Sequence, residues 1–262
     1  MEASLRIGLV ADPHYAEKPP AIGRYYRESL AKLSEAVKVF NDRQVHLAVE
    51  LGDFIDSTEQ DAENLTAIDA AFKQVRAERF YVLGNHCVER LSKREFLAIC
   101  GQRRSFFSVE RNGVHLAFLD GCYRKDGVSY DQGHYEWTDC DIPPDQQRWL
   151  EEDLKGAESR AIVFVHQRLD DREGSSYAIA SSAAIRKILE DSGKVLAVFQ
   201  GHYHKGDHKV INGIRYCTLP AMCDGSGDTN NGYSILSVFA DGSLRMEGFR
   251  KHANHPAVIQ RP

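Results

Sequence analysis

The sequence lacks the features that mark several special classes of protein. None of its six cysteines forms a Cys-x-x-Cys pair, and no zinc-finger spacing occurs. No apolar run approaches the roughly 20 residues that a membrane-spanning helix needs. Residues 1–6 enter a strand-like run without the basic and long apolar segments of a secretory signal. We therefore expect a reduced, cytoplasmic protein that needs neither disulfide staples nor a membrane.

The chain also has fewer basic than acidic residues. The chain has 33 lysines and arginines against 38 aspartates and glutamates, which gives a formal net charge of -5. This balance disfavours nucleic-acid polymers and anionic membranes as partners, because their phosphates would be repelled. A small phosphorylated substrate is compatible with it, since bound cations reverse the charge locally. The oligomeric state is left open by the composition.

Internal repeats, low-complexity segments and domain-separating linkers are absent from the sequence. The 262 residues can bury a substantial core, and we interpret residues 1–262 as a single domain. The polar and aromatic stretch 122–144 is long for a plain connection. We therefore expect a cap or functional loop there.

The first third of the chain alternates between two periodicities. Strand-like apolar runs at 5–11, 46–51 and 80–83 are separated by amphipathic helical patterns at 25–40 and 59–76. Strands that alternate with helices predict right-handed βαβ units and a largely parallel sheet.

The rest of the chain mixes further strands and helices. Asn112-Gly113, between two strand-like runs, is typical of a tight hairpin turn. The C-terminal third alternates strand-like segments with turns, from which we expect antiparallel strands that form a second sheet. The remaining expected elements are strands over 160–165 and 195–200 and helices over 145–154 and 182–191.

Metal-ligand residue types occur at five points, each directly after a strand-like run. Each cluster alone has an ordinary explanation, such as a turn, a helix cap or a core histidine. Their joint occurrence at strand ends, where α/β sheets gather ligands, indicates two adjacent cations. The clusters are Asp12-Pro13-His14, Gly52-Asp53-Phe54-Ile55-Asp56, Gly84-Asn85-His86, His166 and Gly201-His202-Tyr203-His204.

This ordered set resembles the calcineurin-like metallophosphoesterase superfamily, over the range 12–204. The resemblance implies an α/β fold in which two mixed β-sheets pack face to face and helices flank them, a four-layer α/β/β/α sandwich. It also implies two divalent metal ions. One would be held by Asp12, His14, Asp53 and His204 and the other by Asp53, Asn85, His166 and His202, so that Asp53 bridges.

The resemblance also assigns a catalytic role to His86, which would stabilise the phosphoryl oxygens or protonate the leaving oxygen. The family usually has Asp or Glu directly after this histidine, whereas this chain has Cys87. Cys87 cannot hold and charge the ring as well as a carboxylate would, so the sequence leaves the protonation state of His86 open. Asp56 is expected to orient a ligand imidazole from behind.

Two further stretches look like the branch of manganese-dependent ADP-ribose and CDP-alcohol pyrophosphatases. They are residues 23–30 and 142–150, and they favour Mn, although Fe, Zn and Co suit the same ligands. By this resemblance Arg24 would lie beside a second phosphate and Tyr26 near a base or ribose. The alternative is that Arg24 and Tyr26 merely begin a helix with an aromatic staple.

Together these observations predict a two-metal phosphohydrolase. It would cleave phosphoanhydride or phosphodiester bonds of small nucleotide-like substrates with a hydroxide held between the metals. One alternative is a cyclic-nucleotide phosphodiesterase that uses the same metals. Another is a binding protein that keeps the fold without catalysis, which the complete ligand set and the presence of His86 disfavour.

Overall fold

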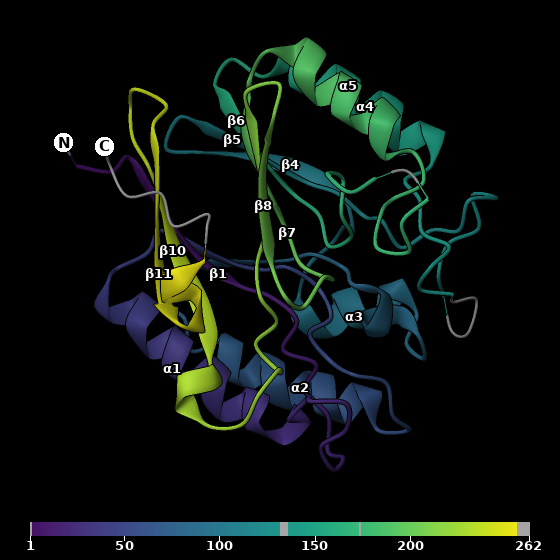
Figure 1. Cartoon of the computed structure of the whole chain (residues 1–262), viewed down its shortest axis with the longest axis vertical. Coiled ribbons are helices and arrows are strands. Elements are labelled where there is room, and N and C mark those ends of the chain that lie inside the picture. Colours follow the sequence, from purple (N-terminus) through teal and green to yellow (C-terminus); the bar gives the residue numbers. More distant parts are fainter. Residues whose placement is uncertain (1, 132–135, 173, 256–262) are drawn as a thin grey trace.

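The computed structural model describes residues 2–131, 136–172 and 174–255. Two β-sheets pack face to face, with helices on both outer sides (Figure 1). The strand order is β11-β10-β1-β2-β3 in the first sheet and β4-β5-β6-β7-β9-β8 in the second. This architecture confirms the expected four-layer sandwich of two mixed sheets.

The first sheet carries the predicted parallel core. β1, β2 and β3 run parallel, and β10 and β11 add antiparallel strands beside β1. Helices α1 and α2 connect the parallel strands and pack against each other. The bounds are β1 Leu5–Val10, η1 Tyr26–Glu28, α1 Ser29–Asp42, β2 Leu47–Glu50, α2 Asp61–Phe72, β3 Glu78–Tyr81, β10 Gly232–Val238 and β11 Leu244–Arg250.

The second sheet is parallel from β5 through β6 and β7 to β9, with antiparallel β4 and β8 at its edges. Helices α4 and α5 pack together on the side away from α1 and α2 (Figure 1). The bounds are β4 Phe107–Arg111, β5 Val114–Phe118, α4 Pro144–Gly156, β6 Arg160–Phe164, α5 Ser182–Ser192, β7 Val195–Gln200, β8 Asp207–Ile211 and β9 Ile214–Thr218.

Two Asn-Gly pairs form the tight hairpins of the second sheet. Asn112 and Gly113 have φ angles of 50° and 74°, and Asn212 and Gly213 have 49° and 86°. Positive φ at both central residues is the requirement of a type I′ turn, which Asn-Gly satisfies best. The hairpin predicted at Asn112-Gly113 is thereby confirmed.

The expectation for the C-terminal strands was partly wrong. They do not form a sheet of their own: β8 and β9 join β7, whereas β10 and β11 return to the first sheet. β10 pairs with β1 from Leu5↔Val238 to Leu9↔Ser234. Alternating polarity predicts a strand but not its partner, because pairing depends on contacts more than 200 residues apart in sequence.

One helix, α3 (Lys93–Cys100), was not expected from the sequence. Its signal is nevertheless present. Ser92 and Glu95 form a reciprocal capping box, and Gly101 ends the helix with a left-handed φ of 75°. α3 follows the 3-10 helix η2 (Asn85–Val88) and packs against α2.

Apolar side chains from the facing sheets fill the space between them. Leu9 and Val49 of the first sheet belong to the same buried cluster as Phe118, Phe164 and Phe199 of the second. This core fixes the two sheets relative to each other and so fixes the distance between their strand ends. Within the described residues, no helix combines the length and apolar character that crossing a bilayer requires.

Candidate metal centre

The residues predicted as metal ligands meet where strands of both sheets end. Asp12, His14, Asp53 and Asn85 follow β1, β2 and β3 of the first sheet, and His166, His202 and His204 follow β6 and β7 of the second. All of them except His204 are at most 7% exposed. The structure therefore brings together, from both sheets, the whole set that the sequence singled out.

Asp53 lies between two groups of ligand-type atoms. Its Oδ2 is 3.4 Å from His14 Nε2 and 3.1 Å from His166 Nε2. Asp12, His14 and Asp53 form one group whose ligand atoms all lie within 4.8 Å of one another, and Asp53, His166 and His202 form another. His204 extends the first group, because its Nε2 lies 3.1 Å from His14 Nε2. Only Asp53 is common to both groups.

Glycines before the ligands let the loops pack this closely. A Cβ at Gly52 would lie 2.4 Å from His166 Nδ1, one at Gly84 would lie 2.1 Å from the Asp53 backbone nitrogen, and one at Gly201 would lie 2.6 Å from Asp12 Oδ2. Such separations are far shorter than a van der Waals contact. The glycine of each Gly-Asp, Gly-Asn and Gly-His pair is therefore required by the site itself.

Four of the ligand-type residues have a left-handed backbone. The φ angles are 50° for Asp12, 45° for His14, 54° for Asp53 and 66° for His202. This conformation is unfavourable for residues other than glycine and costs on the order of 1–3 kcal/mol each. Its concentration at these strand ends is typical of a functional site, where the surrounding fold holds the strain in place.

In three of the imidazoles, Nδ1 lies within hydrogen-bond distance of an acceptor. His14 Nδ1 lies 3.0 Å from Asp56 Oδ2, His166 Nδ1 lies 2.8 Å from the Leu51 carbonyl oxygen, and His204 Nδ1 lies 2.9 Å from Asp224 Oδ1. A hydrogen on each Nδ1 leaves the Nε2 lone pair aimed at the centre.

The expected role of Asp56 behind an imidazole is thus met by its contact with His14. Neither Asp224 nor the Leu51 carbonyl was predicted from the sequence. Asp224 follows β9 and belongs to no recognisable motif, so no local signal pointed to it.

Burial and neighbouring charges set the protonation of the centre. Burial lowers the pKa of His14 to about 3 and holds that of His202 well below its ordinary value, so both rings are neutral. Burial opposes ionisation of Asp53, but the imidazoles, His166 foremost, keep its pKa well below the usual range. Burial also disfavours the charged form of His166, and Asp53 outweighs it and raises the pKa to about 9.

These residues fit divalent cations. His202 Nε2 is fully buried and has no hydrogen-bond partner among the residues that the structure describes, and a buried lone pair of this kind is costly unless a ligand satisfies it. Neutral imidazoles, carboxylates and an amide are the donors that Mn, Fe, Zn and Co accept. The strained and closely packed loops hold these donors in place.

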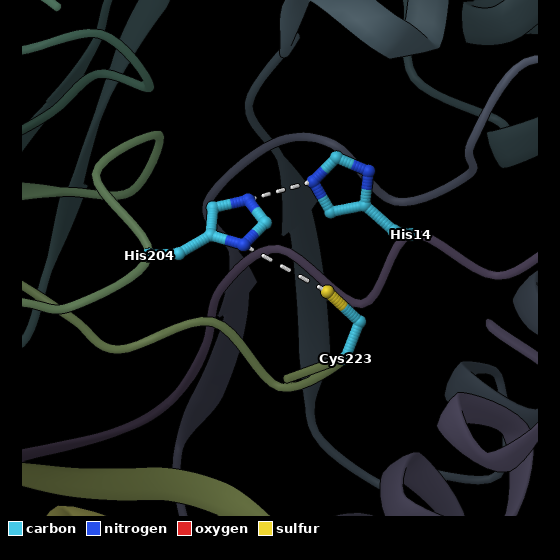
Figure 2. A group of neighbouring side chains, drawn as sticks. All are labelled: His14, His204 and Cys223. Carbon is cyan, nitrogen blue, oxygen red and sulfur yellow. Dashed lines mark hydrogen bonds between the residues drawn. The ribbon is translucent and has the colours of Figure 1, made fainter. Parts of the chain in front are cut away.

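Cys223 lies beside this centre on the outer side of His204. Figure 2 shows the His204 ring between His14 and Cys223, with one ring nitrogen facing each. The Cys223 Sγ is 4.0 Å from His204 Nδ1, the nitrogen that also meets Asp224. Burial raises the pKa of this thiol well above its ordinary value. Cys223 therefore packs as a neutral thiol against the outer edge of a ligand ring.

Cys87 follows His86 but does not border the cavity. Cys87 is fully buried, and its Sγ accepts a hydrogen bond from the Phe54 backbone N–H at 3.4 Å. Its side chain thus points into the core, away from the cavity. His86 has a carboxylate neighbour from another position, because Glu89 Oε2 lies 3.1 Å from His86 Nδ1.

A cavity of about 510 Å³ opens beside the centre and is bordered by Asp53, Asn85 and His86. Three aromatic rings form part of its wall: Tyr177 lies 5.6 Å from Trp137 and 5.1 Å from Tyr203 between ring centroids. Arg24 and Lys205 add positive charge to the lining. The cavity therefore joins a metal-type centre to cations and flat apolar surfaces.

The two substrate-binding candidates are placed differently. Arg24 lines the cavity, and its Nη1 is 3.2 Å from Asp56 Oδ2. Tyr26 is only 4% exposed and lies outside the cavity lining, with Lys18 Nζ 4.4 Å above its ring. Because η1 begins at Tyr26 and turns its ring against the protein, this ring offers almost no surface to a substrate.

Among the described residues of the stretch 122–144, Trp137 lines the cavity wall. Tyr130 is fully buried, and Lys93 Nζ lies 3.6 Å above the Tyr123 ring. His134 and Tyr135 of this stretch lie outside the described residues. The place of Tyr177 and Tyr203 in the cavity wall was not predicted from the sequence, because aromatic residues in loops give no periodic signal.

Comparison with known proteins agrees with this geometry. A family model for the calcineurin-like phosphoesterases matches residues 5–206. A manganese-dependent ADP-ribose/CDP-alcohol diphosphatase of Oryza sativa subsp. japonica is 21% identical over 302 aligned positions, which cover 97% of this chain and 94% of the relative. A protein of the same description from Arabidopsis thaliana is 23% identical, with coverage of 92% and 93%.

Among solved structures, a dimetal phosphatase from Danio rerio superposes with a TM-score of 0.79 at 18% identity, covering 94% of this chain and 96% of that one. This likeness shows the shared fold. The family match spans most of the chain, and the protein therefore belongs to the calcineurin-like phosphoesterase family. It is a metal-dependent hydrolase of this family.

Proposed function

We propose that this protein hydrolyses the phosphoanhydride bond of small diphosphates that carry a nucleoside or similar ring, of the ADP-ribose or CDP-alcohol type, with Mn as the preferred metal. The observation that carries the proposal is the cavity, which joins metal ligands, two cationic side chains and three aromatic rings. The descriptions of the plant relatives support the same substrate class and metal.

Asp12, His14, Asp53 and His204 would hold one ion, and Asp53, Asn85, His166 and His202 the other. When bound, the pair supplies an activated water and neutralises charge on the phosphoryl oxygens. The protein's own part is to keep the His14 and His202 rings neutral and the Asp53 carboxylate charged, which the directions of their pKa shifts favour.

Arg24 and Lys205 suit the second phosphate of such a substrate. Both line the cavity, and Lys205 is exposed and forms no ion pair with any carboxylate in the described part of the chain. Arg24 is held by Asp56, which itself supports the ligand His14. A guanidinium fixed in this way offers its remaining donors to a phosphate at little cost in side-chain entropy. A monoester has no second phosphate to occupy this place.

Trp137, Tyr177 and Tyr203 suit the ring-bearing end of the substrate. Their arrangement leaves flat apolar surface beside His202, whose ring centroid is 5.7 Å from those of Trp137 and Tyr177. Stacking of a base on such rings is worth on the order of 1–3 kcal/mol. The volume of about 510 Å³ lies within the range that small-molecule sites occupy. We therefore propose that Trp137, Tyr177 and Tyr203, and not Tyr26, contact the base or ribose of the substrate.

His86 borders the cavity directly after Asn85. We assign it the transfer of a proton to the leaving oxygen. Burial disfavours its charged form, but Asp53 and Glu89 raise the pKa of the ring above its ordinary value, which favours the protonated state that such a role needs.

The decisive experiment compares kcat/KM for ADP-ribose, CDP-choline, AMP and 3′,5′-cyclic AMP with Mn²⁺. We expect the two diphosphates to be preferred. Arg24→Ala should reduce kcat/KM for them by roughly 10-fold or more, the scale of a lost charge-assisted hydrogen bond, and should change AMP hydrolysis less.

Arg27→Ala is the matched control, because Arg27 pairs with Glu17 on the exposed surface at 2.9 Å. Equal efficiency on AMP would refute the proposed substrate class. A clear preference for cyclic AMP would replace it with the cyclic-nucleotide phosphodiesterase alternative.

A further inference from the structure

We propose that Glu89 is a positioning residue for His86, and that it does in this chain what an acidic residue at position 87 cannot do. The inference rests on the role proposed above for His86. Its basis is one contact: His86 Nδ1 lies 3.1 Å from Glu89 Oε2, within reach of a hydrogen bond.

The local backbone explains why position 89 reaches the ring. Asn85–Val88 form the 3-10 helix η2, and Glu89 continues it with φ -67° and ψ -41°. Side chains three residues apart lie on the same side of a 3-10 helix, because it has three residues per turn. His86 and Glu89 therefore share a side, whereas Cys87 between them turns into the core.

The contact uses the ring nitrogen that the reaction does not need. A hydrogen on Nδ1 donated to Glu89 fixes the plane of the imidazole and leaves Nε2 for the cavity that His86 borders. The ring of His14 packs edge-on against the His86 ring, at 4.9 Å between centroids and 66° between planes. Together these contacts restrict the rotation of the His86 side chain.

Two other carboxylates lie close to this ring: Asp53, whose Oδ1 accepts the His86 backbone N–H, and Asp56, which is occupied elsewhere. Its two oxygens contact His14 at 3.0 Å, Arg24 at 3.2 Å and Lys18 at 2.5 Å. It thus supports a metal ligand and two cations at once. Glu89 forms a separate contact with His86, so removing it should leave the ligand shell intact.

A purely structural role of Glu89 would show as a loss of stability when it is removed, and the contact is too exposed for that. The side chains of His86 and Glu89 are 21% and 32% exposed, and ion pairs near the surface contribute little to stability. Loss of Glu89 should therefore leave Tm and metal content almost unchanged. The effect should fall on kcat, and only in proteins that keep His86.

The test is a double-mutant cycle of Glu89→Ala and His86→Ala, measured with Mn²⁺ on bis(p-nitrophenyl) phosphate and on diesters with poorer leaving groups. We expect Glu89→Ala to lower kcat by roughly 10–100-fold, the range seen when an outer partner of a site residue is removed. KM, Tm and bound metal should change little, and the loss should grow as the leaving group becomes poorer. Glu89→Gln keeps an acceptor and should recover part of the rate.

In the His86→Ala background, Glu89→Ala should have no further effect, because its only route to the reaction is the ring. Additive losses in the double variant would overturn the proposal, and so would loss of metal from Glu89→Ala. Glu151→Ala is the control, since it removes an exposed ion pair with Lys155 away from the site.

A crystal structure of metal-loaded Glu89→Ala gives a second readout that does not depend on turnover. We expect the His86 ring to rotate or to occupy several orientations, and an unchanged ring would refute positioning. Aryl diesters lack the second phosphate and the ribose of the proposed substrates. The double-mutant cycle therefore tests Glu89 even if the protein proves not to prefer ADP-ribose-like diphosphates.

Discussion

At the scale of single residues, Cys87 shows how burial decides what a side chain can do. Its thiol is fully buried, and burial together with Glu50 and Asp53 raises its pKa well above the ordinary value. A protonated thiol that faces the core is neither a nucleophile nor a partner for His86. Its role is to fill space and to accept the Phe54 N–H.

We predict that Cys87→Ser keeps metal content and turnover close to those of the parent protein. The buried hydroxyl should lower the free energy of unfolding by about 1–3 kcal/mol, as measured by urea denaturation. Cys217→Ser, at another buried cysteine in β9, is the matched control. A folded, metal-loaded Cys87→Ser protein without activity would contradict this account.

Cys87→Asp should be far more damaging than Cys87→Ser. It would place an unpaired carboxyl group beside Glu50 and Asp53, at a cost of roughly 3–5 kcal/mol if it stays charged. The acidic residue that is usual in the family therefore cannot simply be restored here. This chain has its carboxylate at position 89 instead.

At the scale of elements, His115 ties β5 to its neighbours. Its Nδ1 lies 2.7 Å from Glu110 Oε1 on β4, and its Nε2 lies 2.7 Å from Asp153 Oδ2 on α4. Asp153 is the largest cause that raises the pKa of this imidazole above its ordinary value of 6.5. The protonated ring therefore links a strand pair to the helix that covers it.

The direction of the His115 pKa shift determines how the stability changes with pH. Because folding raises the pKa of His115, the stabilisation is fully present below the unfolded value of about 6.5. It is lost as the pH rises through the folded pKa. We predict that the difference in unfolding free energy between the parent protein and His115→Gln shrinks from pH 6 to pH 9.

Urea unfolding at several pH values would measure this difference. The control is His46→Gln, at an exposed ring that accepts the Arg6 backbone N–H at 2.9 Å. A difference that is constant over this range, or that grows with pH, would refute the assignment of the stabilisation to the charged ring.

At the scale of the whole molecule, the candidate metal centre lies between the two sheets. The first sheet contributes Asp12, His14, Asp53 and Asn85, and the second contributes His166, His202 and His204. Ions held between them should bind the folded state and not the unfolded one. Metal binding should therefore stabilise the entire sandwich.

We predict that removal of metal with a chelator lowers Tm and that Mn²⁺ restores it. At a free metal concentration 100 times Kd the stabilisation is about 2.7 kcal/mol, which corresponds to roughly 5–10 °C for a chain of this size. Asp53→Ala should abolish this shift, both bound metals and turnover, because the bridging carboxylate belongs to both ligand groups. Retention of two metals and of the parent rate by Asp53→Ala would exclude Asp53 as the bridge.

The sequence by itself determined the family, the parallel core of the first sheet and the residues that converge at the strand ends. These properties are local: a glycine and a ligand directly after an apolar strand are readable in a few residues, as at Gly52-Asp53 and Gly84-Asn85. The ends of parallel strands meet at one edge of a sheet, so the sequence also indicated that the ligands converge.

Only the tertiary structure decided what surrounds those ligands. The support of His204 by Asp224, the aromatic wall containing Tyr177 and the return of β10 to β1 all join segments that follow no common local pattern. Even Glu89, three residues from His86, became recognisable only once η2 was known to be a 3-10 turn. Local patterns fix which side chains stand at strand ends, whereas packing of the loops and the two sheets fixes which groups those side chains meet.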